Sequence, residues 1–203
     1  LCMIDLNTTG WLARFNTQAM EDSFTQLGKL VADESWRRDT TAYLHAFLEH
    51  VEAKYGAVVD AYLLSCGCTC EWQDFSRGAE SPSRRTAWRK WCMDRGHPDP
   101  IDIPPASVRD HITHDLLRDP VQDAVALRYW DFVRWAIGDA ILFYAAKAQE
   151  RLKHRAPLGM FYGYLFEHPQ GRLLNEGHLD FDRVYSSPDL DFFTAPARYQ
   201  DPD

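Results

Sequence analysis

The spacing of apolar residues along the chain predicts alternating strands and helices. Short continuous apolar runs are typical of strands covered on both faces. In residues 35–55, by contrast, Tyr43, Phe47, Val51 and Tyr55 recur every four positions, which is the pattern of a helix with one buried face. In chain order, we expect a strand at 1–6, a helix at 35–55, a strand at 58–64, a helix from 81 to before 96, a helix at about 119–154, and then a strand at 157–166, a helix at 181–185 and a strand at 190–194.

Capping residues mark several of the expected helix ends. Ser81 and Pro82 have the pattern of an N-cap followed by a first-turn proline, and Gly56 and Gly96 should end the helices before them. Alternating strands and helices imply crossover connections and therefore a parallel sheet. The pattern leaves two α/β architectures open, an open doubly wound sheet and a closed (β/α)8 barrel.

The composition is that of an ordinary globular domain. The chain has 203 residues, of which 45% are apolar and 13% aromatic, and 22 basic against 30 acidic residues give a formal net charge of −8. The acidic balance argues against a nucleic-acid partner, because binding nucleic acid requires neutralising phosphates. No apolar run approaches the roughly 20 residues of a membrane span, so we expect no membrane-embedded segment.

The cysteines argue for free thiols. The chain has five, an odd number, and three of them stand in the run Cys66-Gly-Cys68-Thr-Cys70. This count and spacing do not match a disulfide framework, and zinc sites use paired C-x-x-C or histidine ligands instead. We therefore expect buried thiols, no cofactor and no metal, and a reducing compartment such as the cytoplasm is favoured. An open α/β metal protein that uses the three clustered thiols is a weaker alternative.

Polar and aromatic residues follow each expected strand, and in parallel α/β folds active sites gather at these carboxyl ends. Residues 7–11, 65–72, 162–168 and 195–199 occupy these positions, and in the second segment Glu71 directly precedes Trp72. Carboxylates beside aromatic rings suit a carbohydrate site, because rings stack on sugar C–H faces while carboxylates bind hydroxyls or transfer protons. The glycine-rich dinucleotide and phosphate loops and the G-x-S-x-G serine elbow are absent from the sequence.

Four segments, 58–72, 81–91, 157–167 and 177–196, resemble glycoside hydrolases of clan A, most closely the family 42 β-galactosidases and uncharacterised relatives. Two pieces carry most of this likeness. One is the run Cys66-Gly-Cys-Thr-Cys-Glu-Trp72, where the relatives have small residues before Glu-Trp. The other is Gly159-Met-Phe-Tyr-Gly-Tyr-Leu-Phe-Glu167, followed by Gly177-His-Leu and Ser187-Pro-Asp-Leu-Asp-Phe192. The resemblance implies a (β/α)8 barrel that hydrolyses glycosidic bonds with retention.

By this resemblance, residues 1–203 are a partial catalytic domain that holds about half of a TIM barrel, roughly strands three to six. Glu71 matches the general acid/base, and the nucleophile is expected beyond Asp203. The family usually has Asn before this Glu to bind the sugar 2-hydroxyl, whereas this chain has Cys70. The expected partner is an oligosaccharide or glycoside, and the full-length protein is expected to form a homo-oligomer. A half barrel alone should be inactive and poorly soluble.

Six further residues are candidate substrate contacts, and each has a plainer alternative. Tyr162 and Tyr164 alternate along a strand, so either can be core, and Glu167 can form a salt bridge instead. Glu71 itself can cap a helix or pair with an arginine. The candidates are Trp11, Trp72, Tyr162, Tyr164, Glu167 and His178.

One rival function remains open beside the glycosidase. A carbohydrate-binding or structural barrel protein would keep the fold but lack the catalytic pair, and Cys70 in place of Asn is in its favour. Trp88, Trp91 and Trp130 lie at helical spacing and are expected in the core rather than in a site.

Overall fold

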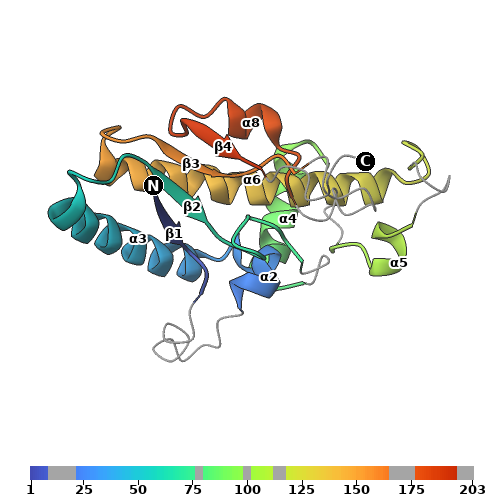
Figure 1. The fold of residues 1–203 in the computed structure, drawn as a ribbon. Helices are drawn as coiled ribbons and strands as arrows, with labels where there is room; N and C mark the ends of the chain where they lie inside the picture. Colours follow the sequence, from blue (N-terminus) through green and yellow to red (C-terminus); the bar gives the residue numbers. More distant parts are fainter. Residues whose placement is uncertain (9–21, 76–79, 98–101, 112–117, 165–176, 196–203) are drawn as a thin grey trace, which may run out of the picture.

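A parallel sheet organises the part of the chain that the structure describes. The computed structural model describes residues 1–8, 22–75, 80–97, 102–111, 118–164 and 177–195. The order of the strands across the sheet follows their order in the chain, so successive crossovers advance in one direction without a reversal. The expected parallel α/β organisation is confirmed (Figure 1). The four strands are β1 (Cys2–Asp5), β2 (Tyr62–Ser65), β3 (Leu158–Phe161) and β4 (Phe192–Thr194).

Three helices connect successive strands and lie on one face of the sheet. They are α3 (Glu34–Tyr55), α6 (Ala124–Leu152) and α8 (Phe181–Tyr185), and α6 contacts both α3 and α8. Three others complete the described part: α2 (Ser23–Leu30), α4 (Pro82–Asp94) and α5 (Ala106–Arg109). Among the described residues, no helix is long and apolar enough to cross a membrane.

Side chains alternate between the two faces of the sheet. Toward the helices, strand residues such as Ile4, Leu64 and Met160 are fully buried in one core cluster. On the opposite face, the register aligns one row across all four strands, Met3, Leu63, Gly159 and Phe192. At the carboxyl end of this face, Asp5 pairs in register with Ser65.

The capping residues behave as their types predict. The Oγ of Ser81 accepts a hydrogen bond from the Arg84 backbone N–H at 3.1 Å, with Pro82 in the first turn of α4. Gly56 ends α3 as expected. The range expected for α8 matches the structure, 181–185.

The second strand starts later than the apolar run suggests. The backbone N–H groups of Val58 and Val59 both donate to the Tyr55 carbonyl, at 2.8 and 3.1 Å. These two residues therefore close the turn after α3, and Val58 is exposed. Their β-branched side chains favour a strand, but the unsatisfied carbonyl at the helix end takes their donors.

Candidate functional site

The loop that follows β2 carries Glu71 and has an unusual backbone. Three non-glycine residues in it are left-handed, with φ of 54° at Thr69, 65° at Cys70 and 60° at Trp72. Each such residue costs of order 1–3 kcal/mol, and such residues cluster at functional sites. Glu71 lies between two of them. The loop is therefore the most strained described segment at the carboxyl edge of the sheet.

Short backbone hydrogen bonds close this loop on itself. The Cys68 N–H donates to the Gln73 carbonyl at 3.1 Å, and the Trp72 N–H donates to the Cys66 carbonyl at 2.6 Å. The two chain segments thus form a narrow neck, and residues 69–71 project from it. A projecting turn at the end of a parallel strand is where α/β enzymes place catalytic side chains.

Glu71 is half-buried and held by its own loop. Its Oε2 accepts hydrogen bonds from the Thr69 hydroxyl at 2.5 Å and from the Gln73 amide at 3.4 Å. The carboxylate therefore has a defined direction and remains accessible. The structure places Glu71 at the strand end where the sequence predicts it, and its catalytic role stays a prediction.

Asp5 and Asn7, from the end of β1, lie beside this loop. The Asn7 Nδ2 lies 3.8 Å from the Cys70 Sγ, and the Asn7 backbone N–H donates to the Asp5 Oδ1 at 3.0 Å. Burial raises the pKa of the Cys70 thiol, and the negative charges of Asp5 and, to a smaller extent, Glu71 raise this pKa further. The Cys70 thiol thus stays protonated at neutral pH and lies within the field of two carboxylates.

Asp5 was not singled out from the sequence, although a signal was present. In the first strand, Ile4 and Leu6 are buried toward the helices, so the period of two turns Asp5 to the opposite face. A carboxylate on the last residue of that strand lies at the same edge as Glu71. Two carboxylates from adjacent strands, with an amide and a thiol between them, can bind sugar hydroxyls as acceptors and donors.

Trp72 does not lie at the surface as a sugar-stacking ring would. Its side chain is fully buried, its indole N–H donates to the Leu64 carbonyl at 3.2 Å, and its ring packs against Tyr144. The ring thus belongs to the core cluster beside α6, and the backbone at position 72 is left-handed. In this structure Trp72 anchors the loop, and we no longer place it among the substrate contacts.

Tyr162, Tyr164 and His178 are brought together, but in a buried cluster. The Tyr162 ring stacks on His178 with centroids 4.8 Å apart, and the Tyr164 ring meets His178 edge-on at 5.0 Å. The Tyr162 hydroxyl accepts from the Asp180 N–H at 2.7 Å, and burial raises the pKa of this phenol. All three side chains are at most 2% exposed, so they pack the strand end instead of facing solvent.

Two candidate substrate contacts are left, together with the alternative of a metal site on the clustered thiols. Trp11 and Glu167 lie outside the described residues. Within the residues that are described, no group of three or more His, Cys, Asp or Glu side chains is arranged to hold a metal ion. Burial raises the pKa of the Cys66 thiol, which makes this sulfur a poor metal ligand or nucleophile.

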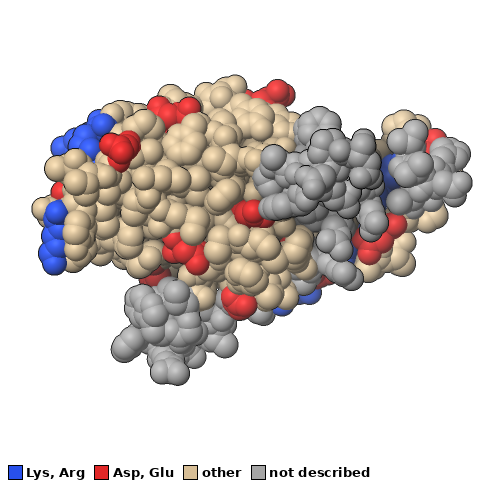
Figure 2. All heavy atoms as spheres, in the orientation of Figure 1, with Lys and Arg blue, Asp and Glu red and all other residues tan. Residues whose placement is uncertain are grey.

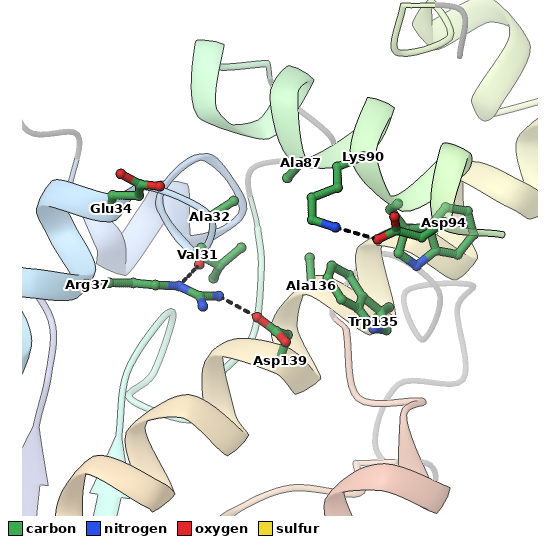
Figure 3. Close-up of a pocket in the computed structure, with 11 residues that line it drawn as sticks. Val31, Ala32, Glu34, Arg37, Ala87, Lys90, Asp94, Trp135, Ala136 and Asp139 are labelled. Carbon is green, nitrogen blue, oxygen red and sulfur yellow. Dashed lines mark hydrogen bonds and ion pairs between the residues drawn. The ribbon is translucent and has the colours of Figure 1, made fainter. Parts of the chain in front are cut away.

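A pocket of about 400 Å³ lies in the helix layer and not at the strand ends (Figure 3). Its described lining residues come from α3, α4, α6 and the turn after α2. Both cations in its lining are paired with carboxylates, Arg37 with Asp139 and Lys90 with Asp94, each at 2.7 Å. Each of these cations is thus neutralised by a carboxylate, and the exposed Glu34 adds one further negative charge to the lining. The pocket lies away from the carboxyl ends of the strands, where parallel α/β folds place their active sites.

The view in Figure 2 shows where charged side chains gather on one face of the molecule. Asp and Glu side chains are scattered over it, and Lys and Arg side chains are grouped mainly at one end.

Compared with known families and curated proteins, the chain matches no protein-family model and no curated protein.

Proposed function

We propose that the chain is part of a retaining glycoside hydrolase and that its four strands form an arc of a (β/α)8 barrel. The sequential strand order with helices on one face supports this, because each barrel strand pairs with the next in the chain. A doubly wound sheet reverses its strand order at a switch point, and the four described strands have no such reversal. The resemblance assigns them as roughly the third to the sixth strand of the barrel.

The observation that carries the proposal is the strained loop that presents Glu71. Three left-handed residues and a closed neck are costly features, and their combined effect is to fix one accessible carboxylate at the carboxyl edge of the sheet. Asp5 and Asn7 supply hydrogen-bonding groups beside it. This is the arrangement expected of a sugar-binding and proton-transferring site.

In the proposed mechanism, Glu71 acts in two steps. As an acid it gives a proton to the glycosidic oxygen as the bond to the anomeric carbon breaks, while a second carboxylate attacks that carbon. As a base it then takes a proton from the water that hydrolyses the glycosyl–enzyme intermediate. The second carboxylate is assigned by the resemblance to another strand of the barrel.

One observation favours a second candidate, a non-catalytic sugar-binding protein. The residue before Glu71 is Cys70, and its thiol lies against Asn7 and within the field of Asp5. A protonated thiol is a weak hydrogen-bond donor, so it replaces an amide poorly at a sugar hydroxyl. Such a protein would bind saccharides without hydrolysing them.

Replacement of Glu71 by Gln tests the proposal. In the full-length protein, Glu71→Gln should lower kcat on lactose or an alkyl β-galactoside by about 100-fold or more, because general acid–base catalysis contributes this much. A dinitrophenyl glycoside needs less protonation, so its turnover should fall less and recover in part with azide. The matched control is Glu34→Gln, which removes an exposed carboxylate from the helix-layer pocket and should leave kcat unchanged.

The outcomes separate the candidates. Near-normal hydrolysis of an alkyl glycoside by the Glu71→Gln variant would exclude Glu71 as the acid. Saccharide binding by the full-length protein in a calorimetric titration, without hydrolysis by that unaltered protein, would favour the non-catalytic candidate.

A further inference from the structure

The side-chain amide of Asn7 pairs with both backbone polar groups of Gly67, its N–H and its carbonyl. The Gly67 N–H donates to the Asn7 Oδ1 at 2.9 Å, and the Asn7 Nδ2 donates to the Gly67 carbonyl at 3.1 Å. The backbone ladder between β1 and β2 reaches the bond from the Leu6 N–H to the Ser65 carbonyl at 2.8 Å. The Asn7 amide therefore continues the ladder with a side chain where the two backbones part.

Neighbouring groups fix the orientation of this amide. The Ser23 hydroxyl donates to the Asn7 Oδ1 at 2.8 Å, and the Ser23 oxygen in turn accepts from the Thr8 N–H at 2.6 Å. The Oδ1 thus accepts from the Ser23 hydroxyl, the Gly67 N–H and, at 3.6 Å, the Cys66 thiol, while the Nδ2 faces the Gly67 carbonyl. A flipped amide would place like groups against one another, so the orientation is set by the network.

The bond to Gly67 reaches the loop of Glu71 directly. The Gly67 carbonyl accepts a second hydrogen bond, from the Cys70 N–H at 3.1 Å, and so begins the turn that leads to Glu71. The Asn7 amide and the Cys70 N–H thus share one carbonyl oxygen. Movement of that oxygen would shift the left-handed Cys70 and the carboxylate that follows it.

The far side of the loop has separate anchors. The Trp72 ring is buried in the core, and the Asp74 Oδ1 accepts from the Gly28 N–H at 2.9 Å. These contacts do not involve Asn7, so its removal should release the near side of the loop while the fold persists. A left-handed segment held on one side only should relax toward commoner backbone conformations.

We infer that Asn7 is a positioning residue for Glu71: its amide holds the Gly67 peptide and thereby sets the direction of the Glu71 carboxylate toward substrate. This role rests on the proposed function, because it concerns the same loop and the same proton transfer. Asn7 itself need not contact the sugar. Its effect should therefore appear in proton transfer to the leaving group rather than in substrate affinity.

In the full-length protein, the experiment compares Asn7→Ala with the control Thr25→Ala, which removes an exposed hydroxyl that donates to the Asp22 carboxylate at the start of α2. With an alkyl β-galactoside, Asn7→Ala should lower kcat at least about 10-fold with KM within about 3-fold. With a dinitrophenyl glycoside, which needs little protonation, the loss should stay under about 3-fold. Thr25→Ala should leave kcat on both substrates within about 3-fold of the unaltered protein.

Hydrogen exchange supplies a readout that does not depend on turnover. In Asn7→Ala, the amides of Gly67 and Cys70 should exchange at least about 10-fold faster, while the amides of Leu64 and Met160 in the sheet stay unchanged.

Each result decides something. Unchanged loop exchange, or equal kcat losses for both leaving groups, would overturn the positioning role. If the unaltered full-length protein hydrolyses no glycoside, the proposed function fails, while loop exchange still reports whether Asn7 holds the loop.

Discussion

At the scale of single residues, the loop of Glu71 shows how backbone strain is sustained. The left-handed residues Thr69, Cys70 and Trp72 persist because the ends of the loop are tied to different parts of the fold. Asn7 holds the near end, and the Trp72 ring holds the far end in the core. A strained backbone conformation persists only where several independent contacts hold it, and this loop has such contacts at both ends.

Gly67 is the residue at which this loop tolerates least change. Its φ is +71°, and a Cβ there would lie 2.8 Å from the Gln73 carbonyl oxygen and 2.8 Å from the Leu27 Cδ2. Gly67→Ala should therefore lower the free energy of unfolding by about 2–5 kcal/mol, from left-handed strain plus overpacking. Urea denaturation followed by circular dichroism measures this loss.

Gly96 supplies the matched control for that substitution. Its φ is +74°, but a Cβ there would meet no atom within 4 Å. Gly96→Ala should cost only about 1–2 kcal/mol, the strain alone. Equal losses for the two variants would show that the neck of the loop repacks around a methyl group.

The predicted site residues show where sequence reasoning stops at this scale. Glu71 was placed after the second strand because the apolar run there ends at Leu64, one residue before β2 ends. The exposure of the tyrosine side chains was harder to predict. The sequence predicts a strand to residue 166, in which Tyr162 and Tyr164 would face one side, but β3 ends at Phe161. At Gly163 the chain turns with φ of +93°, and Tyr164 is buried beside Tyr162. A period of two carries no information once the strand has ended.

At the scale of elements, long periodic segments were predicted well, whereas two short helices were missed although the short α8 was expected. The two long helices α3 and α6 were expected from their spacing, and the indole rings at helical spacing are buried as predicted, at Trp88, Trp91 and Trp130. The helices α2 and α5 were missed. They have only eight and four residues, too few for a 3.6-residue period to be read.

A buried ion pair helps to join α2 and α4 to the segment that follows the loop of Glu71. Asp74, after the loop of Glu71, accepts from the Gly28 N–H in α2 and pairs with Arg84 of α4 at 3.5 Å. Both side chains are at most 3% exposed. Arg84→Met would leave the Asp74 charge in the interior, and breaking a buried pair on one side costs about 3–5 kcal/mol.

The control for this prediction lies on the same helix. Arg89 pairs with Asp102, but both side chains are at least half exposed, so Arg89→Met should change stability by less than about 1 kcal/mol. Chemical denaturation of the two variants side by side tests the difference. If Arg84→Met costs no more than Arg89→Met, Asp74 is compensated without Arg84.

At the scale of the whole molecule, the open question is what lies along the outer edge of β1. The Cys2 and Leu6 N–H groups donate to carbonyls of Ala61 and Ser65 in the β2 segment, each at 2.8 Å. Because donors alternate along a parallel strand, the Met3 and Asp5 N–H groups point to the other side. If the four strands are an arc of a barrel, these two N–H groups donate to a further strand. If β1 is an edge of the sheet, they face solvent.

Hydrogen exchange of these amides distinguishes the two cases. If the edge of β1 is open, Met3 and Asp5 should exchange about two orders of magnitude faster than Leu6. Leu63 and Leu64 in β2 are the control, because β2 has neighbours on both sides and both amides should be slow. If Met3 and Asp5 are as slow as Leu6, another strand pairs with β1. Protection that disappears on dilution would then identify this strand as part of a second copy, whereas protection independent of concentration would favour a sheet that continues within one molecule, as in a barrel.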